Sequence, residues 1–184
     1  MASKLPEVIG LVGPIRAGKT TIAQYLSERY GYVIASNSKI LKKILIDLGL
    51  DHTRDNLGML GNSIFSIFGN DLIARYRLEN LHLGRIVVDG IRYTEELRRY
   101  RNASGFKLLG VQASDDIRFT RAILDPEGHK DLQLTRSKFN EMLLARSELD
   151  VPTLLAGADK VIYNNGSLDQ LLLQVDQAIQ DWTA

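Results

Sequence analysis

Short apolar runs alternate along the chain with longer segments in which apolar residues recur at helical spacing. The runs are four or five residues long, rich in β-branched side chains and nearly continuous in hydrophobicity. This pattern is typical of parallel strands that are covered on both faces. It predicts five strands, at residues 8–12, 32–35, 85–89, 107–111 and 160–163.

Three of the intervening segments have the periodicity of amphipathic helices. The second of them stops at Gly69, and the last begins with Ser167 and Gln170 in a Ser-x-x-Gln capping box. Their apolar faces consist of Ile40, Leu41, Ile44, Leu45 and Leu48, of Leu57, Leu60, Ile64, Phe65 and Phe68, and of Leu168, Leu171, Leu172, Val175, Ile179 and Trp182.

Strands that alternate with helices predict βαβ units with right-handed crossovers. The fold class is therefore α/β, with a five-stranded parallel sheet flanked by helices in three layers. A length of 184 residues fits a single domain over residues 1–184. The polar segment 125–135, which contains Pro126 and Gly128, predicts either a mobile lid or an ordinary solvated loop.

Composition narrows the chemistry further. The chain has no Cys, which excludes disulfides, cysteine-ligated metals and a thiol nucleophile. Lys and Arg number 23 against 22 Asp and Glu, so we expect no strong nucleic-acid binding. No apolar run has the length of a signal peptide or a membrane span, and we therefore expect a cytoplasmic protein without membrane contact.

The segment directly after the first run, Gly13 to Thr20, matches the phosphate-binding pattern G-x-x-x-x-G-K-[ST]. Its glycines allow successive backbone N–H groups to face phosphate oxygens, and Lys19 brings a positive charge to the outer phosphates. The hydroxyl of Thr20 can ligate Mg²⁺. We predict binding of ATP with Mg²⁺ by Gly13, Ala17, Gly18, Lys19, Thr20 and Thr21.

Asp89 ends the third predicted strand, where the second acid of such a site is expected to hold the Mg²⁺ through water. An acid at a strand end can also be only a turn or cap residue. Beside a phosphate-binding loop we favour the functional interpretation, with Thr20 and Asp89 as the metal site.

Other P-loop classes lack support. Ras-type GTPases need D-x-x-G after the third strand and N-K-x-D later. Asp89-Gly90 lacks the first spacing, and N-K-x-D does not occur in the sequence. Transporter ATPases and AAA motors need larger domains. The size of the chain and its arginines fit a small kinase better.

Several stretches carry a family resemblance. Gly13 to Thr20, Asp89-Gly90-Ile91-Arg92, and the pair Arg118 and Arg121 resemble the nucleoside monophosphate kinases, including adenylate kinase, deoxynucleotide monophosphate kinase-like proteins and dephospho-CoA kinase-like proteins. Residues 54–62 and 158–167 are similar as well. The resemblance implies a P-loop NTPase fold with acceptor-binding helices at about 38–82 and a small lid at about 125–137.

The resemblance also implies roles for individual residues. Arg92 and Arg54 would bind the acceptor phosphate, and Arg118 and Arg121 would face the transferring phosphoryl group. The catalytic set is then Lys19, Asp89, Arg118 and Arg121. The loop 164–166, with Asn165, would pack against adenine.

Most arginines of a soluble protein are solvated or form weak surface pairs. Arg98, Arg99 and Arg101 have this interpretation, whereas Arg136 and Arg146 are undecided. Two positions depart from the family pattern: Ser38 and its neighbour Ser36 lie where relatives often have an acid, and Leu124 and Asp125 lie where an arginine is common.

The leading hypothesis is Mg-ATP-dependent phosphoryl transfer to a nucleoside or deoxynucleoside monophosphate. A second hypothesis moves transfer to a hydroxyl, as in dephospho-CoA, another small metabolite or a modified nucleic-acid base, with Asp89 accepting the proton. A third is a non-catalytic ATP-binding regulatory module. The expected partner is a small-molecule acceptor, and the protein is expected to be a monomer or a homodimer.

Overall fold

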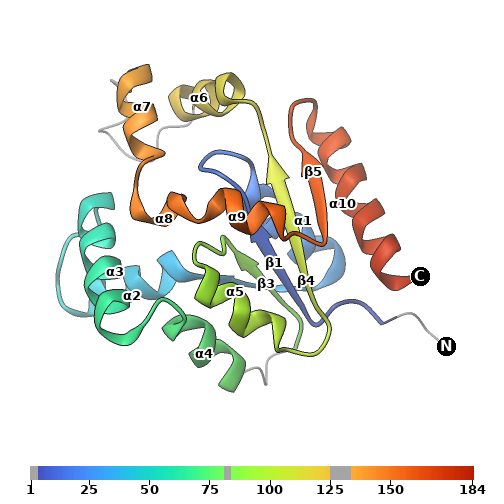
Figure 1. The fold of residues 1–184 in the computed structure, drawn as a ribbon, viewed down its shortest axis with the longest axis horizontal. Coiled ribbons are helices and arrows are strands. Elements are labelled where there is room, and N and C mark those ends of the chain that lie inside the picture. The colour runs from blue at the N-terminus through green and yellow to red at the C-terminus, as the bar shows by residue number, and fades with distance from the viewer. Residues whose placement is uncertain (1–3, 81–83, 125–133) are drawn as a thin grey trace.

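A parallel five-stranded sheet in the order β2-β3-β1-β4-β5 forms the centre of the molecule (Figure 1). The computed structural model describes residues 4–80, 84–124 and 134–184, except the side chain of Arg54. Its strands are β1 (Val8–Val12), β2 (Val33–Ser36), β3 (Ile86–Asp89), β4 (Phe106–Gln112) and β5 (Lys160–Tyr163). All five predicted strands are confirmed, with ends that shift by one residue or less.

The described helices begin with α1 (Lys19–Tyr30), α2 (Asn37–Asp47), α3 (Arg54–Phe68), α4 (Leu72–Glu79) and α5 (Thr94–Arg101). They continue with α6 (Asp115–Leu124), α7 (Arg136–Met142), α8 (Arg146–Leu149), α9 (Val151–Ala156) and α10 (Leu168–Thr183). The three periodic segments are α2, α3 and α10. Helix α3 ends at Gly69, and Ser167 and Gln170 form the predicted capping box of α10.

Alternate residues of β1 feed two separate cores. Ile9 and Leu11 pack with side chains of α1 and α10 on one face of the sheet. Val8 and Val12 pack with side chains of α4, α5 and α9 on the other face. These residues are essentially inaccessible to water, so the predicted three-layer α/β fold is confirmed.

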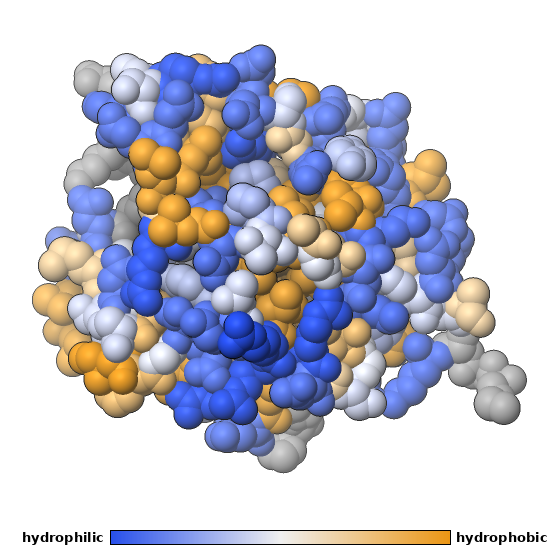
Figure 2. All heavy atoms as spheres, in the orientation of Figure 1, coloured by the Kyte–Doolittle hydropathy of each residue, from blue (hydrophilic) through white to orange (hydrophobic). Residues whose placement is uncertain are grey.

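The surface facing the viewer in Figure 2 is hydrophilic over α5, whereas hydrophobic residues gather toward α3 and the segment between α7 and α8. Exposed apolar residues of these two segments are Met59, Ile67, Phe68, Leu144 and Leu149. No helix within the three described ranges is long and apolar enough to cross a membrane.

Strand β1 lies at the position where the order of the strands changes direction. The chain leaves β1 toward β2 and β3 on one side, and β4 and β5 lie on the other. Open α/β sheets bind ligands beyond the carboxyl ends of the strands at such a point. The loop that follows β1 lies there, and so do the residues that follow β3 (Figure 1).

Candidate active site

The loop from Gly13 to Gly18 connects β1 directly to the N-terminus of α1, and two of its glycines are required by their surroundings. A Cβ on Gly13 would lie 2.1 Å from the carbonyl oxygen of Val111, and one on Gly18 would lie 2.3 Å from Nδ2 of Asn164. Gly18 also has a φ of +105°, which favours glycine. The backbone can therefore curl at these two positions only because no side chain is present to clash with its neighbours. The N-terminus of α1, the positive end of the helix dipole, faces the loop.

Lys19 is buried at the start of α1, with 7% of its surface exposed. Its ammonium group folds back on the loop and donates hydrogen bonds to the carbonyl oxygens of Gly13 at 2.7 Å and Pro14 at 2.8 Å. The pKa of Lys19 is lowered to about 7, mainly by burial and next by the positive charge of Arg92, while the negative charges of Glu148 and Asp89 oppose the shift.

Thr20 and Asp89 meet as the sequence predicts for a magnesium site. The hydroxyl of Thr20 donates a hydrogen bond to Oδ2 of Asp89 at 3.1 Å, although the two residues are 69 positions apart. Asp89 is the last residue of β3 and pairs in register with Ser36 of β2. The hydroxyl of Thr20, in the first turn of α1, and the carboxylate of Asp89, at the end of β3, are oxygen donors of the kind that Mg²⁺ prefers.

Arg92 follows β3 and is fixed at both its backbone and its side chain. Its N–H donates to Oε2 of Glu96 at 3.0 Å, and its guanidinium forms an ion pair with Glu148. The other oxygen of Glu148 accepts the N–H of Ile15, within the phosphate-binding loop, at 3.0 Å. One buried carboxylate therefore joins the predicted acceptor arginine to the loop.

Arg118 and Arg121, on α6, contact the phosphate-binding loop through its carbonyl oxygens. Arg118 donates to the oxygen of Ile15 at 3.2 Å and pairs with Asp115. Arg121 donates to the oxygen of Arg16 at 3.5 Å and to Asn164 at 3.0 Å. In this conformation both guanidinium groups support the loop.

The loop after β5 contributes through a different asparagine from the one the sequence indicates. Asn164 is buried, and its amide donates to the carbonyl oxygen of Ala17 at 2.9 Å. Asn165 is exposed and accepts a hydrogen bond from the backbone of Ser114 at 2.8 Å. That Asn165 packs against adenine stays a prediction, and the structure adds Asn164 as the residue of this loop that contacts the phosphate-binding loop.

Other predicted residues lie at the margins of the described structure. Thr21 is exposed on the first turn of α1. Arg54 begins α3, but its side chain is outside the described residues, as are residues 125–133 of the predicted lid. Arg146 stacks over the ring of Tyr93, with 5.6 Å from its guanidinium carbon to the ring centre.

The sequence does not predict the role of Glu96, a buried carboxylate that contacts the backbone of Arg92. Glu96 is 1% exposed, accepts hydrogen bonds from the backbone of Arg92 and from Asn37 at 3.1 Å, and lies near Arg77. Arg77 in turn donates to Asn37 at 2.7 Å and to the hydroxyl of Tyr100 at 3.2 Å. Glu96 and Glu148 belong to no sequence motif, and each is an acid in a short helix, so the sequence pattern alone does not single them out.

Comparisons with known proteins agree with this geometry. A protein-family model described as "AAA domain" matches residues 9–138. A UPF0200 protein of Methanocaldococcus jannaschii is 30% identical and covers 95% of this chain and 89% of its own length. A dephospho-CoA kinase of Fusobacterium nucleatum is 25% identical, with 92% and 95% covered. Shikimate kinase from Acinetobacter baumannii, solved with shikimate, superposes with a TM-score of 0.61 at 19% identity over 97% of this chain and 95% of its own.

The sheet order, the glycine-lined loop and the buried Lys19 define a P-loop protein with a kinase-like fold. The chain belongs to the family described as "AAA domain" and to the UPF0200 proteins. The predicted resemblance to P-loop kinases of the dephospho-CoA kinase-like group is confirmed.

The low pKa of Lys19 predicts that nucleotide binding takes up a proton. A polyphosphate beside the ammonium favours the charged form and raises its pKa again. Between pH 7.5 and 9 the affinity for Mg-ATP should therefore fall with rising pH, by up to about tenfold per unit. Calorimetry in two buffers of different ionisation enthalpy measures the uptake. Equal heats in both buffers would contradict the prediction, and Lys19→Arg, which stays charged, should show no uptake.

Proposed function

We propose that this protein transfers the terminal phosphoryl group of Mg-ATP to a small-molecule acceptor. The observation that carries the proposal is the link through Glu148, which joins the phosphate-binding loop at Ile15 to the guanidinium of Arg92. A protein that only bound ATP would need the loop but would not need a cation held rigidly beside it. Phosphoryl transfer requires such positioning, because catalysis depends on orientation and charge stabilisation.

The nucleotide side of the site follows from the loop. Gly13 and Gly18 provide the curled backbone, α1 provides its N-terminus, and Lys19 provides a charge that must leave two carbonyl oxygens to reach a phosphate. Thr20 and Asp89 fit the Mg²⁺ ion. When bound, the metal would neutralise phosphate charge, while Lys19 stabilises the charge that develops during transfer.

The acceptor binds between Arg92 and the helices α2 to α4. These helices belong to the acceptor-binding region predicted from the sequence, at about residues 38–82. Arg92 binds an anionic group of the acceptor and directs it toward the loop.

Two acceptor classes remain. A nucleoside or deoxynucleoside monophosphate supplies an ionised phosphate oxygen and needs no general base. A hydroxyl acceptor needs a carboxylate nearby, and this second class is favoured by the carboxylate of Asp89, which contacts Thr20 and lies close enough to Lys19 to influence its pKa. The names of the similar proteins, dephospho-CoA kinase and shikimate kinase, indicate hydroxyl acceptors for those proteins.

The test is a transfer assay with purified protein, Mg²⁺ and ATP against a panel of acceptors. The panel holds the ribo- and deoxynucleoside monophosphates, dephospho-CoA and shikimate, and products are separated chromatographically. One acceptor should give a product, and Arg92→Ala should lower kcat/KM for it by about 10²–10³-fold because a guanidinium directed at the acceptor is lost.

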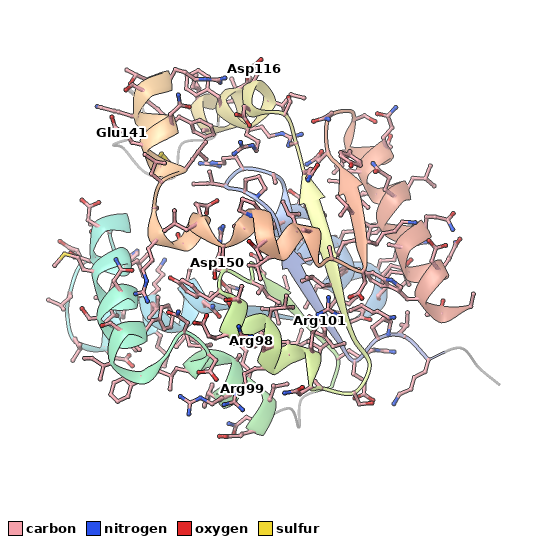
Figure 3. The ribbon with its side chains drawn as sticks, viewed as in Figure 1. Arg98, Arg99, Arg101, Asp116, Glu141 and Asp150 are labelled. Carbon is pink, nitrogen blue, oxygen red and sulfur yellow. The ribbon has the colours of Figure 1, made fainter. Side chains whose placement is uncertain are left out.

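The matched control is Arg98→Ala, which removes an exposed arginine of α5, six residues further along the chain (Figure 3). Its activity should equal that of the wild type. Binding of Mg-ATP without a product from any acceptor would overturn the kinase proposal in favour of a regulatory module. A product that Arg92→Ala forms at the normal rate would remove Arg92 from the site.

A further inference from the structure

Residues 146–150, which follow α7, contact three consecutive residues that begin with Arg92. Arg146 stacks over Tyr93, Glu148 pairs with Arg92, and Asp150 accepts the N–H of Thr94 at 2.9 Å. Figure 3 shows Asp150 between α8 and α9, beside α5. Three successive residues of one loop are thus bound by α8 and its flanking residue.

Glu148 is the one member of this set that also touches the phosphate-binding loop. Only 7% of its side chain is exposed, against 24% for Arg92. Its two oxygens are divided, with Oε1 on the guanidinium of Arg92 and Oε2 on the N–H of Ile15. A charge-assisted bond of this kind restricts a guanidinium far more than solvent does.

We propose that Glu148 is the positioning residue of the acceptor site, which holds the guanidinium of Arg92 at a fixed place beside the phosphate-binding loop. This inference rests on the proposed function. Without Glu148 the arginine side chain samples many rotamers, and ordering it again on acceptor binding costs conformational entropy. Because Glu148 contacts the loop through Ile15 and not through Lys19 or Thr20, its loss weakens acceptor binding much more than ATP binding.

The neighbouring charges are consistent with this role. Arg92 and Arg118 both contact the loop or its partners, and both positive charges act on Lys19. Glu148 is the buried anion among them, so it lets Arg92 lie close to Lys19 before any phosphate is present. A neutral residue at this position would leave the two cations to repel each other, and Arg92 would turn away toward solvent.

The experiment compares the full-length wild type with Glu148→Gln and Glu148→Asp. Glutamine keeps the shape but removes the charge and one acceptor, and aspartate keeps the charge but shortens the reach. The matched control is Glu141→Gln on α7, an exposed carboxylate whose side chain accepts only a long, 3.5 Å bond from Ser137 in the described structure (Figure 3). The measurements are KM and kcat for the acceptor identified by the panel, Kd for Mg-ATP, and the NMR signals of the Arg92 guanidinium, assigned with Arg92→Lys.

We expect Glu148→Gln to raise the acceptor KM at least tenfold, with kcat and the Kd for Mg-ATP within twofold, and Glu148→Asp to recover part of the loss. The Arg92 guanidinium protons, resolved in the wild type, should average to one solvent-exchanging signal in Glu148→Gln. Glu141→Gln should match the wild type in every measurement.

Unchanged acceptor KM together with unchanged Arg92 signals would overturn the inference, as would a lower KM, which would mark Glu148 as an inhibitory counterion. A fall in kcat with a shifted pH profile and constant KM would also overturn it, because Glu148 would then act as a base. If the wild type phosphorylates nothing, the proposed function fails, and the NMR signals alone decide whether Glu148 orders Arg92. If Glu148→Gln does not fold, Glu148→Asp supplies the same comparison.

Discussion

Replacing Lys19 by methionine is expected to reduce Mg-ATP binding below detection and to lower kcat/KM for phosphoryl transfer by about 10³-fold. Methionine has nearly the length of lysine and packs similarly in the loop, but it lacks the positive charge that binds phosphate. Equilibrium binding of Mg-ATP by calorimetry and the transfer assay measure the two effects.

The fold should survive this replacement, because keeping an ammonium group buried costs free energy. The lowered pKa of Lys19 shows that its surroundings disfavour the charged form, so the methionine variant should unfold in urea at the same or a higher concentration. Lys160→Met is the matched control. It removes a half-exposed lysine paired with Asp181 at the opposite end of β5 from the loop, and it should bind Mg-ATP normally. Unaltered binding by Lys19→Met would contradict the assignment of the loop.

The layers of the fold could be predicted from the sequence because each strand is short, apolar and followed by a helical period. The segment 8–12 illustrates this, since its alternate residues fill two cores and every position is apolar or glycine. The strand order was not predictable in the same way. It depends on which strand β1 accepts as a neighbour, and both neighbours, β3 and β4, are equally apolar.

The residues that bind phosphate could be predicted from the sequence, because phosphate binding requires them at a fixed spacing. Gly13, Gly18, Lys19 and Thr20 belong to one loop and the first turn of α1. Thr20 meets Asp89 because that loop follows β1, and Asp89 ends the neighbouring strand β3. The roles of Arg118 and Arg121 at the phosphoryl group stay predictions. In the described conformation both donate to carbonyl oxygens of the loop.

The supporting residues were beyond reach of the sequence. Glu148 meets Ile15 across 133 positions and Arg92 across 56, and no local pattern fixes such distances. Asn164 likewise reaches Ala17 from the far end of the chain. A buried polar residue can be recognised only when its partners are known. From the sequence alone, a glutamate in a four-residue helix such as α8 is expected to lie on the surface.

Glu96 carries the largest effect on stability that we expect. Replacing it by alanine removes the acceptor for two buried donors, the N–H of Arg92 and the amide of Asn37, and it leaves Arg77 without its buried anion. Unsatisfied buried groups of this kind cost about 3–5 kcal/mol in total. Urea unfolding at pH 7, followed by circular dichroism, measures the loss in the free energy of unfolding.

Glutamine at this position separates the hydrogen bonds from the charge. Burial raises the pKa of Glu96 above its ordinary value of 4.5, so in the range just above pH 4.5 the folded state binds more protons here than the unfolded state does. The proton-linked part of the stability that Glu96 contributes is therefore complete below pH 4.5 and is lost as pH rises through the folded pKa, whereas its hydrogen bonds remain. Glu96→Gln keeps an acceptor and does not titrate. Relative to this variant, the wild type should be more stable at pH 4 than at pH 7, and a difference that stays constant or grows with pH would show that the surrounding cations, and not burial, control the carboxyl group.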